Sequence, residues 1–261
     1  MKKINIIAVI SMLLAITFIG SCKKNVLTVS PYDVTDGQAL LKINYASPYA
    51  LNPAVQIKIN GVRVSPATIN YPTPFPGGGL NTNGTNYADY FAVTPGKDSV
   101  VISIPKKNTN IDSLVVFATA VTTVANEYQT LHITDTAANT QAVYVLDPPN
   151  KPDSGFVKYR FVNLIPNSTT GIDLYFGTTK LLSNIAYKQV SDTFSLPAGN
   201  SLAWSIRATG AAVPLNTIAN RAVYTSASTV ANQRVFTIYA AGYIGLTDAT
   251  RPARVSFIYN K

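Results

Sequence analysis

The sequence is poor in the side chains that carry most cofactor-independent catalysis. Its 261 residues include one cysteine, Cys22, one histidine, His132, and one glutamate, Glu127. Such catalysis usually depends on a general base or on paired carboxylates. The sequence also lacks the G-x-S-x-G and H-E-x-x-H motifs and a P-loop. We therefore expect a protein that is not an enzyme and that needs no cofactor.

The same scarcity argues against metal and nucleic-acid sites. One histidine and one cysteine cannot supply the four ligands of a structural zinc site, and no Asp-rich loop has calcium spacing. The formal net charge is +9, but no run exceeds two lysines. Nucleic-acid binding needs a basic stripe or patch. We expect no metal and no nucleic-acid partner.

The chain has one long apolar run, and it lies at the N-terminus. Residues 1–3 are a cationic start, residues 4–19 are nearly all apolar, and two small residues precede Cys22. This is the layout of a secretory signal peptide. The run of 16 residues is shorter than the roughly 20 that span a bilayer as a helix. An uncleaved anchor helix is the alternative.

Ile19-Gly20-Ser21-Cys22 resembles a bacterial lipobox, in which the cysteine is acylated before the signal peptide is removed. The resemblance implies a signal peptide over 1–21, lipid attachment at Cys22 and a lipidated tether over 22–37. Acyl chains hold a protein at a membrane because each buried methylene contributes about 0.8 kcal/mol. Lys23 is not the aspartate that retains some lipoproteins in the inner membrane. We expect attachment to the outer membrane, facing the periplasm or the cell surface.

Beyond the signal peptide, apolar residues recur at every second position. Residues 55–59, 172–176 and 202–206 show this alternation, which predicts strands with one buried face. Turn residues such as Asn60-Gly61 and Gly199 separate the strands at intervals typical of sandwiches. The sequence therefore predicts an all-β protein of immunoglobulin-like, Greek-key β-sandwich domains.

The second half of the chain repeats the first. "LLKINYASP" (40–48) parallels "FVKYRFVNL" (156–164), and residues 90–104 parallel residues 193–206. An internal repeat of this length indicates tandem domains. We predict a first domain over 38–147, a linker over 148–155 and a second domain over 156–261. Three prolines make the linker semi-rigid.

The first copy carries an insertion of 13 residues between matched positions. The insertion maps to residues 71–87, whose Pro, Gly and Asn content is typical of a loop. Tyr71, Phe75 and Tyr87 surround three glycines there, and long loops often carry binding sites. The loop is either a ligand site at these three residues or a flexible segment without a ligand.

The second copy contains a series of elements that resembles a known family. It opens with a strand over 158–163, continues with Asp173 in the strand 172–176, and reaches Leu-Pro-Ala-Gly at 196–199. These elements resemble the family called domain of unknown function 4397, which is common in envelope lipoproteins of Bacteroidota. The resemblance covers residues 38–261 and implies an envelope location. The family has no assigned chemistry, so it implies no catalytic residue.

Three short motifs resemble the O-glycosylation sequon of Bacteroidota, in which an aspartate precedes the modified hydroxyl. They place candidate glycosylation sites at Ser99, Ser113 and Thr136, each directly after an aspartate. A glycan at these positions would add bulk and solubility outside the core.

Two single residues have a functional and a structural interpretation. Trp204 could stack on a sugar ring, but it shares a strand face with Leu202 and Ile206, which favours a core position. His132 alternates with two aliphatic residues, so we expect it on the exposed face of a strand.

The sequence thus favours a non-catalytic outer-membrane lipoprotein, a monomer whose paired domains bind a glycan, extracellular matrix or another envelope protein. A structural spacer without a specific ligand is the first alternative. A hydrolase that uses Asp173 or Asp192 is the second.

Overall fold

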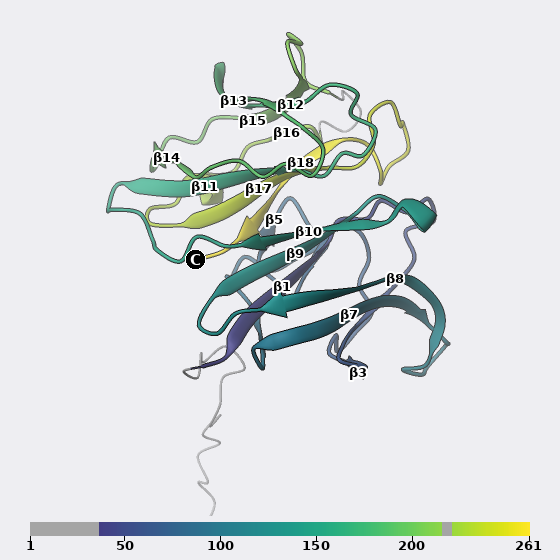
Figure 1. Cartoon of the computed structure of the whole chain (residues 1–261). Helices are drawn as coiled ribbons and strands as arrows, with labels where there is room; N and C mark the ends of the chain where they lie inside the picture. The colour runs from purple at the N-terminus through teal and green to yellow at the C-terminus, as the bar shows by residue number, and fades with distance from the viewer. Residues whose placement is uncertain (1–36, 216–220) are drawn as a thin grey trace, which may run out of the picture. The chain divides into compact units, whose positions relative to one another are not determined.

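The computed structural model describes residues 37–215 and 221–261 (Figure 1). The predicted signal peptide, Cys22 and all but the last residue of the predicted tether lie outside the described residues. The described residues are mostly strands, and no α-helix occurs among them. This confirms the prediction of an all-β protein built from sandwiched sheets.

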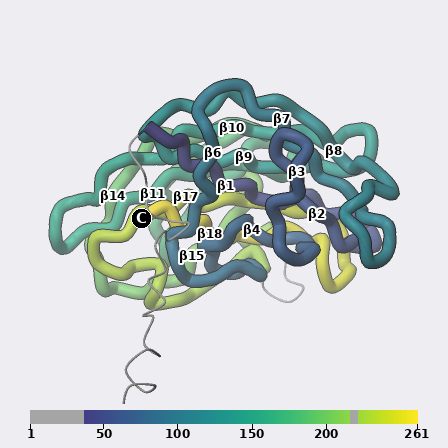
Figure 2. Tube along the Cα trace, turned by 90° about the horizontal axis from the view of Figure 1, so that it is seen from below, coloured from purple at the N-terminus to yellow at the C-terminus, as the bar shows by residue number. Residues whose placement is uncertain are grey.

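The first half of the chain supplies two sheets. One has the strand order β10-β9-β1-β4 with β6 also on β1, and the other has the order β3-β2-β7-β8. Figure 2 shows β1 running between its neighbours. The strands are β1 (Ala39–Tyr45), β2 (Gln56–Ile59), β3 (Val62–Arg63), β4 (Thr73–Phe75), β6 (Phe91–Val93), β7 (Gly96–Pro105), β8 (Asp112–Thr123), β9 (Tyr128–Thr134) and β10 (Gln141–Leu146), with the 3-10 helix η1 (Ala137–Asn139) before β10.

The second half supplies two further sheets, of order β14-β11-β17-β18-β5 and β13-β12-β15-β16. One of these strands, β5, comes from the first half. The strands are β5 (Gly79–Leu80), β11 (Phe156–Asn163), β12 (Ile172–Phe176), β13 (Thr179–Ile185), β14 (Phe194–Pro197), β15 (Trp204–Ala208), β16 (Val223–Tyr224), β17 (Val235–Ala241) and β18 (Arg254–Tyr259), with the 3-10 helix η3 (Ala227–Val230) before β17.

The pairing pattern of the first half recurs in the second. β1 pairs in parallel with β9, and β11 pairs in parallel with β17. β9 then pairs antiparallel with β10, as β17 does with β18. β2 lies between β3 and β7, as β12 lies between β13 and β15. The division into two domains stays a prediction, since the described residues 37–215 and 221–261 group into one compact unit.

Each half has an apolar cluster between its two sheets, and each cluster also takes in residues of the other half. In the first half, Ile43 of β1 packs in one buried cluster with Ile57 and Ile102 of the facing sheet. In the second half, the Trp204 ring centroid lies 4.9 Å from that of Tyr159. Its indole N–H donates to Thr229 Oγ1 at 3.1 Å, so its polar atom is satisfied. Trp204 is fully buried, which confirms the predicted core position.

Residues 71–87 connect the two halves. β4 pairs with β1 of its own half, whereas β5 pairs with β18 of the second half. Tyr259 N donates to Gly78 O at 2.8 Å beside this pairing. Gly78 has φ +80, and a Cβ there would lie against Tyr87 O and 2.7 Å from Lys42 Nζ. Only glycine therefore fits this close approach of three segments.

The β10-β9-β1-β4 sheet packs on the second half with the face opposite its own core. Lys42 Nζ on that face donates to Tyr259 O at 2.6 Å, and the His132 ring lies 6.1 Å from the Tyr239 ring. His132 is 0% exposed, so the prediction of an exposed histidine is wrong, although its strand face is as expected. Burial, helped by the charges of Lys42 and Arg160, lowers the pKa of His132 to about 3. We call this buried contact between the halves the seam.

Candidate functional site

The structure separates the three aromatic residues of the predicted ligand loop. Tyr71 and Phe75 are buried in the core of the first half. Tyr87 is 74% exposed. Only Tyr87 is therefore open to a ligand, and residues 71–87 serve chiefly to hold the halves together.

Two of the three predicted glycosylation sites lie on the surface. Ser99 on β7 and Ser113 on β8 are exposed. Thr136 is half-buried, and its hydroxyl lies 3.1 Å from the hydroxyl of Tyr243. Ser99 and Ser113 are thus accessible to a modifying enzyme, and glycosylation stays a prediction at all three.

The predicted hydrolase residue Asp173 holds its own strand in place. Asp173 Oδ1 accepts from Asn184 N at 2.9 Å, Thr209 Oγ1 at 3.0 Å and Ser183 Oγ at 3.2 Å. Its side chain is fully buried. Burial acts to raise the pKa of Asp173, but the backbone donors outweigh it and hold the pKa below its usual range. The second carboxylate of that alternative, Asp192, is exposed.

No metal centre is evident in the described part of the chain, where no three His, Cys, Asp or Glu side chains gather. Residues 37–215 and 221–261 also include no helix long and apolar enough to cross a membrane.

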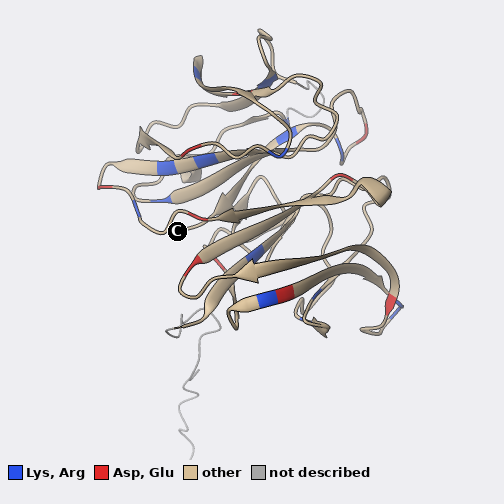
Figure 3. Ribbon diagram, in the orientation of Figure 1, with Lys and Arg blue, Asp and Glu red and all other residues tan. Residues whose placement is uncertain are grey.

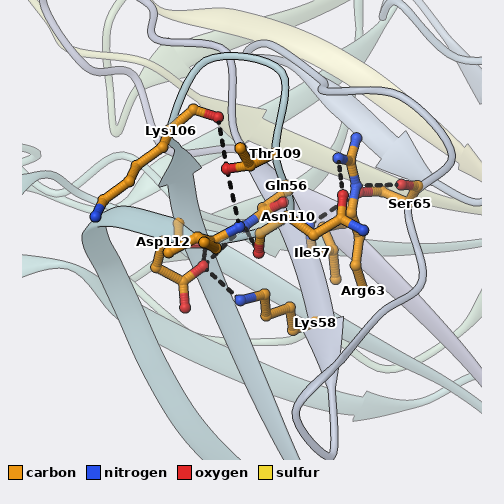
Figure 4. A network of polar contacts seen from close by, with 11 residues as sticks. Gln56, Ile57, Lys58, Arg63, Ser65, Lys106, Thr109, Asn110 and Asp112 are labelled. Carbon is orange, nitrogen blue, oxygen red and sulfur yellow. Dashed lines mark hydrogen bonds and ion pairs between the residues drawn. The ribbon is translucent and has the colours of Figure 1, made fainter.

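A polar concavity lies where the turn after β7 folds over the outer face of the β3-β2-β7-β8 sheet (Figure 4). Its volume is about 380 Å³. It is open to solvent and lined by polar side chains from two segments of the first half. The lining residues are Arg63, Thr68, Pro105, Asn108, Thr109 and Asn110.

Asp112 lies two residues beyond the lining Asn110 and anchors a polar cluster at the start of β8. Its Oδ1 accepts from Lys58 Nζ at 2.8 Å, from Gln56 Nε2 at 2.8 Å and from the hydroxyl of Ser103. The hydrogen bonds from Lys58 and then Ser103 hold the pKa of Asp112 below its usual range. Among the described residues no hydrogen bond engages Oδ2, and the side chain is 30% exposed. The charged carboxylate therefore keeps one oxygen for a ligand.

Gln56 connects the Asp112 cluster to the turn that lines the concavity. Its Nε2 also donates to Asn110 O at 3.1 Å, and this covering turn explains why Gln56 is fully buried on the outer face of a sheet. Gln56 Oε1 is buried and finds no partner among the described residues. A buried acceptor of this kind is usually satisfied by a water or a ligand.

Arg63 forms one wall of the concavity in a fixed orientation. Its Nε donates to Ser65 O at 2.8 Å and its Nη1 donates to Asn110 Oδ1 at 2.8 Å. Because Asn110 Oδ1 accepts from Arg63, the amide group of Asn110 is left with two donors. Exposed apolar side chains flank the site, with Ile111 and Leu114 each 59% exposed. The arrangement offers fixed donors and acceptors beside a small apolar rim.

The concavity lies at the far end of β8 from the start of the described chain. β8 begins at Asp112 and ends at Thr123, a length of about 36 Å at roughly 3.3 Å per residue. The turn that follows holds the beginning of the described chain, because Gly37 N donates to Asn126 Oδ1 at 2.9 Å. Asn126 N in turn donates to Gln38 O at 2.7 Å.

The sequence pattern alone does not predict this site. The signal that could have pointed to it is "KKNTNID" (106–112), a polar segment with two lysines and one aspartate between two stretches rich in Val and Ile or Thr. Nothing in that segment indicates that its aspartate meets Gln56 and Lys58, which lie more than fifty positions earlier in the chain.

Comparison with known proteins leaves the family open. No family model and no curated protein matches the chain. Among solved structures, a proposed cell adhesion protein from Bacteroides uniformis ATCC 8492 aligns with 87% of this chain and 100% of its own chain, at 10% identity and a TM-score of 0.17. A similarity of that size carries no argument about fold or function.

Proposed function

We propose that this protein is a non-catalytic lipoprotein of the bacterial outer membrane that binds a partner through the concavity of its first half. The predicted lipid at Cys22 would attach it through residues that precede Gly37. The observation that carries the proposal is the position of the concavity, about 36 Å along β8 from the turn that holds Gly37. A protein tethered in this way would present the site away from its attachment.

The chemistry of the site favours a neutral glycan as the partner. Each sugar hydroxyl both donates and accepts hydrogen bonds, which matches an Asn110 amide, an Arg63 guanidinium and a free Asp112 oxygen. These side chains are already held by protein contacts, so binding orders few new rotamers. An envelope protein with a polar loop is the other partner that fits the same groups.

A structural spacer is the second candidate function. The observation that favours it is the seam, where buried Lys42 and strand β5 join the halves into one compact unit. A spacer needs this rigidity and makes no use of the concavity.

Glycan-array binding of the exported chain, residues 22–261 with Cys22→Ser, separates the two functions. We expect binding to a limited set of neutral glycans, with affinity reduced at least tenfold by Arg63→Ala or Asn110→Ala, since bidentate and charge-assisted contacts are lost. Asn150→Ala, an exposed amide in the linker, is the matched control and should bind like the wild type. Absence of binding, or equal binding by all three variants, would favour the spacer.

A further inference from the structure

Four basic residues gather at one end of the second half. They are Lys151 of the linker, Lys158 of β11, Arg234 before β17 and the C-terminal Lys261. Lys158 N donates to Arg234 O at 2.9 Å. Lys151 and Lys158 line one open cavity of about 380 Å³. Burial and then the nearby charge of Lys151 lower the pKa of Lys261. The four residues therefore form one group, which we call the basic end.

The basic end is not neutralised by acids. The described residues contain three ion pairs, and none involves these four residues. Lys158 Nζ instead donates to Asn150 O at 3.1 Å, and Lys261 Nζ donates to Pro149 O. Figure 3 shows the blue basic bands of β11 at this end.

Two acidic residues accompany the basic end. Asp153 lines the same cavity as Lys151. Glu127 immediately precedes Tyr128, whose ring centroid lies 4.3 Å from Lys261 Nζ. Four basic side chains against these two acidic residues and the α-carboxylate of Lys261 leave a small net positive charge.

The basic end lies where the described chain begins. Tyr128, under Lys261 Nζ, pairs with Leu40 across β9 and β1. Gly37, three residues before Leu40, donates a hydrogen bond from its backbone N–H to the side chain of the neighbouring Asn126. The sixteen residues from Cys22 to Gly37 span at most about 50 Å when extended. A membrane that holds a lipid on Cys22 is thus within reach of these basic residues.

We propose that the basic end docks on the anionic phospholipid headgroups of the membrane that holds the protein. The proposal rests on the proposed function for the lipid anchor, and it adds a second contact that orients the concavity away from the membrane. Positive charge complements an anionic surface, and each lysine or arginine near it strengthens binding about fivefold. The attraction falls off within about 10 Å at moderate salt.

Vesicle co-sedimentation of residues 22–261 with Cys22→Ser tests the docking without any lipid anchor. We expect the chain to sediment with phosphatidylcholine vesicles that contain phosphatidylglycerol, and not with phosphatidylcholine alone or at high salt. Lys151→Glu combined with Arg234→Glu should weaken binding at least tenfold. Lys106→Glu combined with Lys107→Glu makes the same charge change beside the concavity and should leave binding within about twofold.

Three results would overturn the docking. They are no binding to anionic vesicles, equal loss in both double variants, and binding that inorganic phosphate abolishes at an ionic strength where sodium chloride does not. Equal loss would mean attraction by net charge alone, and phosphate competition would mean a free-phosphate site. Labelling of Cys22 with radioactive palmitate in cells tests the anchor separately, so failure of one does not imply failure of the other.

Discussion

Gln56 and Asp173 occupy equivalent positions on β2 and β12, yet the two halves surround them differently. In the second half the carboxylate of Asp173 is fully buried, and both of its oxygens accept hydrogen bonds. In the first half the carboxylate is supplied by Asp112, the first residue of β8, and none of the described residues forms a hydrogen bond with its Oδ2. The same arrangement of strands therefore carries a closed polar cluster around Asp173 in the second half and an open polar cluster around Asp112 in the first half.

This difference indicates that the closed cluster around Asp173 stabilises the fold, whereas the open cluster around Asp112 can bind a ligand. A buried carboxylate that accepts several N–H and O–H donors cannot leave its position without exposing those donors. A partly exposed carboxylate held through one oxygen can accept a ligand without rearrangement. The comparison predicts unequal effects when each acid is changed.

The largest effect should come from Asp173→Asn. The new amide keeps one acceptor oxygen, but its NH2 group must face the N–H of either Asn184 or Gly210, so we expect a loss of about 2 to 3 kcal/mol in the free energy of unfolding. Urea denaturation measures it. Because the folded-state pKa of Asp173 is lowered, its stabilising charge is present above the unfolded pKa of about 3.9 and is lost as pH falls through the folded value. A loss under about 0.5 kcal/mol would mean that the closed cluster around Asp173 does not stabilise the fold.

A slightly smaller loss is expected from Gly78→Ala, which tests how firmly the halves are joined. The left-handed backbone at φ +80 and the crowding by Lys42 and Tyr87 should cost about 2 kcal/mol. Trp204 fluorescence reports the second half, and far-UV circular dichroism reports both. We expect one shared transition, shifted to lower urea. Two separate transitions would show that the seam does not couple the halves.

Asp112→Asn should change stability little and binding strongly. The pair with Lys58 is partly exposed, so we expect a loss below about 1 kcal/mol in the free energy of unfolding. Affinity for a glycan bound by the wild type should fall at least tenfold, because a ligand hydroxyl loses a charged acceptor. Isothermal titration and urea denaturation of the same sample separate the two quantities. Destabilisation as large as that of Asp173→Asn would mean that the two clusters do not differ.

A separate test concerns the pH dependence of the seam, whose effect develops only as pH falls below about 6.5. Buried His132 has a pKa of about 3, whereas in the unfolded chain the value is about 6.5. The unfolded state therefore takes up a proton first, and stability should fall as pH decreases from about 6.5 toward 3. His132→Gln should flatten this part of the curve relative to the wild type, as followed by thermal unfolding across pH. Identical slopes of stability against pH for the two proteins would mean that His132 is exposed to water in the folded protein and that its pKa is not lowered.

Local features of the chain were accessible from the sequence. Alternation over 202–206 predicted a strand with Trp204 inside, because the period of two is a property of neighbouring residues. The strand face of His132 followed from the same rule. Its burial did not, since the covering Tyr239 lies more than a hundred positions away.

Long-range contacts account for what the sequence did not predict. Residues 71–87 have loop composition, but Leu80 pairs with Phe257 of the second half. Near the concavity, the pairing of β7 with β8 shifts register between Ile102 and Ser103, and Gln56 Nε2 donates to Asp112 Oδ1. Periodicity within a segment contains no information about either contact.

Hydrogen–deuterium exchange with and without a bound glycan tests the central claim most directly. The open cluster of the first half predicts that the ligand protects residues 105–112 and 63–68, while the equivalent region of the second half, around Asn184 and Gly210, exchanges as before. Protection confined to the second half, or spread equally over both, would contradict the assignment of binding to the concavity.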